Sequence, residues 1–298
     1  MPTLEEQIEK IVKKRIDYID DSLNASWSEM ANIQKELTVL VLKSYLKKFD
    51  TEAGLLKFNT KNLNLINELD SIFTQFSNRY SKKVFKDVGM KMLDMVVYSE
   101  DYFRKFGSTE KTFSQIESSL DLIAQRIGIT PEGKLIKNSY IDRLATSSKF
   151  KEELKDFVAK GLAEKTSLKD FQAGFLEQIE GTKEVDSKLL RYWKTETHDA
   201  FFSVSRAHDD VFAKKLRMDY FLYLPGKIST SRDFCIKKVG KCFHRKDMEK
   251  WKQQDWAGKN LDYNPIRDMG GHNCMHSASW ISSELAKRRY PDKYNEYE

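Results

Sequence analysis

The side chains best suited to chemistry are concentrated near the end of the chain. All three cysteines and three of the five histidines follow residue 219, and these six potential ligands are Cys235, Cys242, His244, His272, Cys274 and His276. Thiolate and imidazole groups are the ligands that tetrahedral zinc prefers in proteins. Cys235, Cys274 and His276 are the first three candidate ligands, and His244 or His272 is the candidate fourth. In an extended segment, His272, Cys274 and His276 project from one face, which would bring three ligands together.

Two other interpretations of these cysteines stay open. Zinc knuckles usually contain a C-x-x-C pair, and the sequence has none. Cys235 and Cys274 could instead be small buried residues that pack two loops together. A Cys235–Cys274 disulfide, formed in oxidising surroundings after release, is the third interpretation. The sequence therefore indicates a structural zinc ion as one alternative and assigns no cofactor with certainty.

The same residues also raise the question of catalysis. His272, Asn273 and His276 beside a metal are the residue types of a His-Asn-His nuclease, in which a histidine activates water near a metal-bound phosphate. Cys235 and His276 could form a nucleophile–base pair, although their spacing does not show that they meet. The sequence contains no Walker-type phosphate loop, no H-E-x-x-H and no Rossmann glycine pattern. We therefore assign no catalytic residue and expect a protein that is not an enzyme.

Short basic clusters offer a second alternative, a DNA-binding module. Lys237-Lys238, Arg245-Lys246 and 287–289 could contact phosphates, although short charge runs more often form a solvated face. The net charge of +6 is spread over 51 basic and 45 acidic residues, which is a mild positive bias. This bias permits contact with nucleic acid and does not argue for it.

Amphipathic helices account for most of the first 217 residues. The chain has only 13 glycines and 5 prolines, which is typical of a helix-rich protein. Apolar residues recur at helical spacing, and the expected helices are 4–19, 26–49, 60–76, 82–106, 114–127, 147–162, 166–181 and 185–217. We expect Thr60 to cap the third of these helices and the segment 166–170 to cap the seventh.

The pattern changes after residue 219. The segment 219–224 is aromatic and strand-like, and Pro225-Gly226 is a turn signal. The predicted fold is therefore mainly α, with an elongated helical region at 1–184. A long helix then leads into a small α+β module that contains the cysteines and histidines, and together these form a second region at 185–298.

Membrane insertion and secretion are not indicated. The most apolar run, 37–42, is too short to span a bilayer. The first 14 residues alternate charged and apolar side chains without a continuous apolar core, so we expect no secretory signal. The chain has only three cysteines, all beyond residue 230, which is typical of proteins in a reducing compartment. We therefore expect the protein to be made in the cytoplasm, which for a viral protein is the cytoplasm of the infected host cell.

Five separated blocks carry a resemblance to a known family. In order and approximate spacing, Tyr220–Tyr223, Thr230–Cys235, Gly240–Phe243, Trp251–Lys259 and Gly270–His276 resemble the C-terminal domain of phage Mu F-type minor head (head morphogenesis) proteins. The family pattern has a strand ending in aromatics, a TSR-x-FC turn, a GK-x-F step, a Trp-containing helix and a closing GG-x-NCRH. The resemblance covers roughly the segment 185–298, whereas the N-terminal region matches only in style.

The resemblance implies a structural role in a virion. It implies a minor head protein of a tailed phage, present in a few copies and acting in capsid assembly or DNA packaging near the portal or inside the head. The expected partners are the portal or other capsid proteins and the packaged DNA. Thr230, Arg232, Gly271 and Asn273 would shape the loops of the module. Met275 stands where the pattern has arginine, which removes any role for an arginine there.

Overall fold

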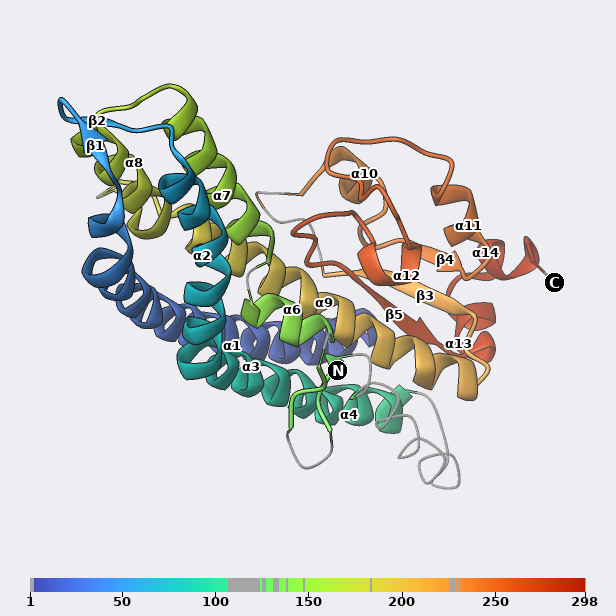
Figure 1. Cartoon of the computed structure of the whole chain (residues 1–298). Coiled ribbons are helices and arrows are strands. Elements are labelled where there is room, and N and C mark those ends of the chain that lie inside the picture. Colours follow the sequence, from blue (N-terminus) through green and yellow to red (C-terminus); the bar gives the residue numbers. More distant parts are fainter. Residues whose placement is uncertain are drawn as a thin grey trace. The chain divides into compact units, whose positions relative to one another are not determined.

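The computed structural model confirms a mainly α fold with a small α+β region near the C-terminus (Figure 1). It describes residues 3–106, 124, 127–130, 134–137, 139–146, 148–182, 184–225, 229 and 231–297. The predicted helix at 114–127 lies almost wholly outside these residues, and so does Thr230. In the part of the chain that the structure describes, no helix is both long enough and apolar enough to cross a membrane.

The chain forms two compact units, each assembled from separated segments. Unit 1 consists of Met1–Ser22, Met90–Ile127 and Thr197–Glu298, and unit 2 consists of Leu23–Gly89 and Gly128–Glu196. Helices α1 (Leu4–Leu40), α3 (Lys82–Asp94) and α9 (Lys188–Lys215) contribute residues to both units. The expected boundary at 184/185 falls inside unit 2, because α9 begins in that unit and continues into unit 1 at Thr197.

Several helices differ from the sequence-based expectation. The expected helices 4–19 and 26–49 are one helix, α1, which is followed by a π-helical turn η1 (Val41–Tyr45) and a 3-10 turn η2 (Leu46–Lys48). The residues between the two expected helices include no glycine or proline, so nothing in the local sequence ends the helix there. The expected helix 82–106 is divided into α3 and α4 (Val96–Phe106).

Unit 2 is a helical body built around aromatic side chains. It contains the hairpin of β1 (Thr51–Glu52) and β2 (Leu55–Leu56), a π-helical turn η3 (Ser77–Ser81), and the helices α2 (Thr60–Phe76), α6 (Tyr140–Thr146), α7 (Ser148–Ala163) and α8 (Leu168–Glu180). Trp193 is fully buried, with its ring centroid 6.3 Å from that of Phe76 and 5.8 Å from that of Phe85. Such ring pairs contribute stability beyond the apolar area they bury.

Two helix starts in unit 2 test the expected caps. Ser167 caps α8, because its side chain accepts a hydrogen bond from the N–H of Asp170 at 3.1 Å, and this confirms the expected cap. Helix α2 is capped by Asn59 and not by Thr60, since the Asn59 side chain accepts from the N–H of Asn62 at 2.8 Å. Asparagine is at least as good an N-cap as threonine, so the neighbouring residue takes the position.

Unit 1 contains a three-stranded antiparallel sheet with the order β4-β3-β5. The strands are β3 (Tyr220–Leu224), β4 (Cys242–His244) and β5 (Ser277–Ile281), and every residue of β3 and β5 is buried. The central strand aligns Phe221 with Phe243 on one side and with Trp280 on the other. The strand-like segment expected at 219–224 is thus confirmed as the middle of the sheet.

Short helices connect and flank these strands. They are α10 (Asp233–Ile236), α11 (Asp247–Trp251), α12 (Pro265–Asp268), α13 (Ser283–Arg289) and α14 (Pro291–Asn295). Figure 1 shows α9 running beside the sheet, and side-chain contacts from α9 to the residues before β5 agree with this arrangement. Together with the loops between them, the short helices and the sheet form the packed core of the C-terminal part of unit 1.

A buried polar network joins the helices of unit 1. The guanidinium of Arg15 on α1 donates to the Asp209 carboxylate on α9 at 2.5 Å, and the Ser99 hydroxyl on α4 donates to the same carboxylate at 2.7 Å. Arg15 and Asp209 are both almost fully buried. A buried ion pair of this kind makes the removal of either partner costly, because the other charge is left uncompensated.

Candidate metal centre

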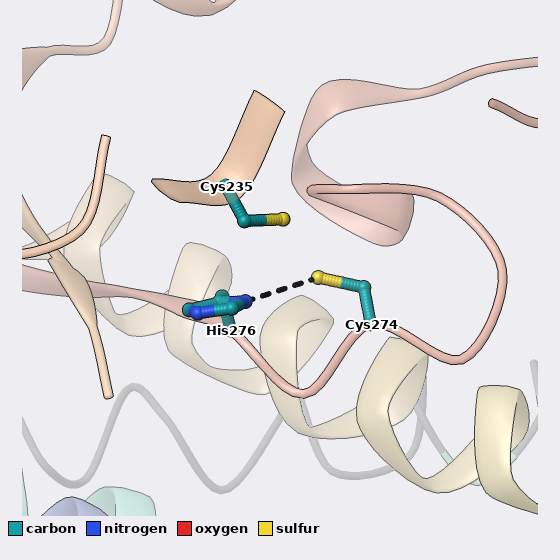
Figure 2. Close-up of side chains that lie close together, drawn as sticks. All are labelled: Cys235, Cys274 and His276. Carbon is teal, nitrogen blue, oxygen red and sulfur yellow. Dashed lines mark hydrogen bonds between the residues drawn. The ribbon is translucent and has the colours of Figure 1, made fainter. Parts of the chain in front are cut away.

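Two thiols and one imidazole meet inside unit 1. Cys235 lies on α10, Cys274 lies in the loop after α12, and His276 directly precedes β5. Figure 2 shows the two sulfur atoms pointing toward one another, with the His276 ring directed at the Cys274 sulfur. The structure thus brings together the three residues that the sequence suggested as first ligands.

The three groups are close and secluded from solvent. Their potential ligand atoms all lie within 4.8 Å of one another, and Cys274 Sγ is 3.6 Å from His276 Nδ1. The exposed fractions of Cys235, Cys274 and His276 are 1%, 3% and 2%. Both cysteines are free thiols.

A glycine makes room for the two sulfurs. A Cβ atom on Gly270 would lie 2.3 Å from Cys235 Sγ and 2.9 Å from Cys274 Sγ, so any larger residue would displace one of them. The Gly270 N–H also donates to Cys274 Sγ at 3.2 Å. Gly271 has φ +93°, and a Cβ there would lie 2.0 Å from the carbonyl oxygen of Gly258. The sequence singled out Gly271 and missed Gly270, whose importance depends on a contact with a residue 35 positions away.

Arg206 holds the loop that carries two of the three residues. Its guanidinium donates to the main-chain oxygens of His276 at 2.9 Å and of Arg267 at 2.6 Å, and also to that of Cys274. Arg206 is only 5% exposed. Five donors in a planar fork suit an arginine to several carbonyls at once, which a lysine cannot match. No motif in the sequence marks this arginine, because its partners are main-chain atoms.

Tyr223 contacts both Cys235 and His276. Its hydroxyl donates to Cys235 Sγ at 3.3 Å, and its ring stacks on His276 with a centroid separation of 5.0 Å. Burial raises the pKa of Tyr223 well above its ordinary value, and the neighbouring sulfurs of Cys274 and Cys235 act in the same direction. The phenol therefore stays protonated and acts as a donor while the cluster holds no metal.

The two thiols differ in acidity. A hydrogen bond from Cys235 lowers the pKa of the Cys274 thiol well below its ordinary value, and His276 and the positive charge of Arg206 contribute to the same effect despite burial. The shared hydrogen bond and burial raise the pKa of Cys235. One hydrogen bond therefore acts on both thiols and shifts their pKa values in opposite directions.

Neither histidine considered for the fourth ligand position joins this group. His244 lies on β4 opposite Tyr220, its Nδ1 accepts from the Lys246 N–H at 3.1 Å, and its ring stacks on Tyr297. Burial lowers the pKa of His244. His272 is 57% exposed, and its Nδ1 lies 3.4 Å from an oxygen of Asp199. A metal bound by Cys235, Cys274 and His276 would therefore need a different fourth ligand.

The other motif residues hold neighbouring loops. The Arg232 guanidinium donates to the main-chain oxygen of His272 at 2.5 Å. Asn273 has a left-handed backbone with φ 55°, and its N–H donates to an Asp199 oxygen at 2.7 Å. Burial raises the pKa of Asp199, but hydrogen bonds from His198 and from the Asn273 N–H outweigh it and hold this pKa below its ordinary value. Thr230 lies outside the described residues, so its role stays a prediction.

The arrangement separates the residues of the considered nuclease motif. His276 faces the sulfurs inside the module, whereas His272 and Asn273 contact Asp199 near the surface. A His-Asn-His nuclease needs its histidines in one solvent-accessible site with the metal. The chain places them in two different environments.

The basic clusters also differ in their surroundings. Lys238 is buried, with its Nζ 3.4 Å from the centroid of the Phe234 ring, and this burial lowers its pKa to about 8. Arg245 is paired with Asp210 and lies over the Trp280 ring. The cluster 287–289 at the end of α13 is exposed. In two of the three basic clusters, one residue therefore packs inside the module, against an aromatic ring, and is not a free surface charge.

Comparisons of this chain with protein-family models, with curated proteins and with solved structures each found no match.

Proposed function

We propose that this chain is a structural minor head protein of a tailed phage, similar to the Mu F-type family. In this proposal it acts in capsid assembly or DNA packaging near the portal or inside the head. The observation that carries the proposal is the convergence of the five resembling blocks on one packed module. Separated motifs whose residues contact one another are the expected outcome if the pattern specifies a domain.

Contacts between the blocks support this point. Tyr223 of the first block donates to Cys235 of the second, and Trp256 of the fourth donates through its indole N–H to the oxygen of Gly270 at 2.9 Å. Phe234 and Trp256 stack with a centroid separation of 3.8 Å. The third block enters through β4, where Phe243 aligns with Phe221. Each block thus contributes a residue to the packing of another block.

The burial of the cluster supports an assembly role in preference to catalysis. A catalytic nucleophile or metal must be reached by its substrate. Cys235, Cys274 and His276 are each at least 97% buried, and Tyr223 and Gly270 lie directly beside them. Such a cluster can stabilise a small module, and small modules with a limited core often need this kind of additional constraint.

The experiment for this proposal is proteomics of purified virions. Particles are prepared from the phage, or from the induced lysogen, that encodes the chain, and their proteins are quantified against the portal protein. We expect the chain in mature particles at a few copies, and we expect deletion of its gene to yield heads that are defective or lack DNA. Intact, DNA-filled and infectious particles without the chain would overturn the proposal.

A binding assay with purified proteins tests which capsid protein the chain contacts. The purified chain is mixed with the portal protein and with the major capsid protein of the same phage, and complexes are separated by size. Binding to either protein supports the assembly role. Enzymatic activity together with absence from particles would instead favour the nuclease alternative.

A further inference from the structure

The distance between the Cys274 sulfur and the His276 nitrogen matches an edge of a tetrahedral zinc site. With Zn–S bonds near 2.3 Å and Zn–N bonds near 2.0 Å, a tetrahedral S···N edge is about 3.6 Å and an S···S edge about 3.8 Å. The observed distance from Cys274 Sγ to His276 Nδ1 is 3.6 Å, and all three ligand atoms fall within 4.8 Å. A metal could therefore enter with only small side-chain movements.

We propose that Cys235, Cys274 and His276 bind a structural zinc ion, with the Tyr223 oxygen at the fourth position. The Tyr223 oxygen lies 3.3 Å from Cys235 Sγ, and its ring is stacked on His276, so it is beside two of the three ligands. A tetrahedral S···O edge would be about 3.5 Å. This inference does not depend on the phage assignment.

The imidazole of His276 gives an independent reason to expect a metal. It is 98% buried, its Nε2 has no hydrogen-bond partner among the described residues, and its Nδ1 meets only a sulfur at 3.6 Å. Burying an imidazole without good hydrogen bonds is unfavourable. A bond between Nδ1 and zinc would offset this cost.

Gly270 and Arg206 hold the proposed ligands in position for a metal ion. The Gly270 N–H bonded to Cys274 Sγ stabilises a thiolate, and the missing side chain at Gly270 keeps space beside both sulfurs. Arg206 fixes the main chain at Cys274 and His276 from the other side. Groups that orient ligands in this way are a regular feature of protein metal sites.

Charge and ligand type favour zinc over other ions. Two cysteine sulfurs and an imidazole nitrogen are the ligand types that zinc prefers, and the Arg206 guanidinium, bonded to the Cys274 main chain, adds positive charge beside the sulfurs. Calcium and magnesium prefer oxygen ligands, and no carboxylate belongs to the group in the described part of the chain. Full burial leaves no open coordination position for a substrate, which is typical of a structural site.

The site would link segments that lie far apart in the sequence. Cys235 and Cys274 are separated by 39 positions, and no C-x-x-C pair supplies ligands from one turn. The metal would therefore join α10 to the loop before β5, across the central strand that carries Tyr223. The module would gain a constraint where its regular secondary structure is sparse.

The test begins with metal content of the full chain, purified without chelators. We expect about one zinc per chain in the natural sequence and less than about a tenth in Cys235→Ala and in Cys274→Ala. Cys242→Ala is the matched control, because Cys242 is the remaining cysteine, on β4, and does not belong to the group. We expect this control to keep its zinc, and Tyr223→Phe to bind zinc about 10- to 100-fold more weakly.

Two measurements on the natural sequence keep the test decisive where a variant fails to fold. Cobalt(II) exchanged into the protein should show the thiolate-to-metal absorption of a tetrahedral site. Cys235 and Cys274 should resist a thiol reagent until a chelator is added. Zinc-free protein that gives no cobalt signal would overturn the proposal, as would zinc kept by both cluster variants. A native mass two hydrogens lower, indicating a Cys235–Cys274 disulfide, would also overturn it.

Discussion

Arg206 on α9 donates to the main-chain oxygen of His276 at 2.9 Å, so a side chain of the long helix holds the backbone directly before β5. The same guanidinium bonds the oxygens of Cys274 and Arg267. A single buried residue therefore determines the path of the loop that carries two members of the cluster. The stability of this loop should depend on Arg206 more than on any exposed arginine.

We expect Arg206→Met to lower the free energy of unfolding by about 2–4 kcal/mol, because two buried main-chain carbonyls and one partly buried carbonyl lose a charged donor, and methionine replaces only the volume. Urea denaturation followed by tryptophan fluorescence would measure the loss. Arg288→Met, at an exposed position of α13, is the control and should change stability by less than about 0.5 kcal/mol. Equal effects of the two substitutions would contradict the role given to Arg206.

Gly270→Ala should be more damaging than its small size suggests. Its Cβ would lie 2.3 Å from Cys235 Sγ, and we expect a loss of about 3 kcal/mol from this overlap, at the upper end of the usual cost of overpacking. Gly240→Ala is the matched control, since its Cβ would meet nothing within 4 Å and only its φ of +73° is unfavourable. That strain costs about 1–2 kcal/mol. Thermal unfolding would rank the two, and a milder effect at Gly270 would show that the sulfurs move aside freely.

The buried pair of Arg15 and Asp209 predicts strong coupling. We expect Arg15→Met to cost about 3–5 kcal/mol, because Asp209 stays buried and keeps only the neutral Ser99 hydroxyl as a donor among the described residues. Adding Asp209→Asn removes the uncompensated charge and should recover part of this loss. A double-mutant cycle by chemical denaturation measures the coupling. Additive effects of the two substitutions would mean that the pair contributes no specific interaction.

His208 predicts how stability depends on pH. Burial lowers its pKa to about 3, and the charge of Arg15 acts in the same direction. The unfolded chain, with an ordinary histidine pKa near 6.5, binds the proton first. The stability present above about pH 6.5 is therefore lost as the pH falls toward 3, with a slope approaching about 1.4 kcal/mol per pH unit.

The useful window for this measurement is roughly pH 6.5 to 4.5, where most carboxylates remain ionised. Urea denaturation of the natural sequence and of His208→Gln across the window would isolate the contribution of His208. We expect the variant to lose most of the slope. An unchanged slope would place the pH dependence on other groups.

Nuclease activity should be absent. We expect the purified chain to leave double-stranded DNA intact with magnesium, manganese or zinc, because His276 is buried while His272 lies beside Asp199. Gel analysis of plasmid DNA would check this. Cleavage that disappears in His272→Ala would contradict the assignment and favour the enzyme alternative.

The sequence by itself determined the local features of this protein. Helical periodicity and scarce glycine and proline predicted the α-rich region, and the aromatic segment 219–224 predicted the strand that the structure places at Tyr220–Leu224. The cap at Ser167 was predictable because it depends on residues three positions apart. The choice of Cys235, Cys274 and His276 as a set came from residue type alone.

Only the tertiary structure decided how these features combine. The exclusion of His244 and His272 from the cluster, and the roles of Arg206, Gly270 and Tyr223, depend on contacts between segments tens of residues apart. Arg206 acts on main-chain carbonyls and Gly270 acts through the absence of a side chain, so neither leaves a pattern in the sequence. The physical reason is that periodicity and capping are short-range, whereas the meeting of α10, β3 and the loop before β5 depends on the packing of the whole unit.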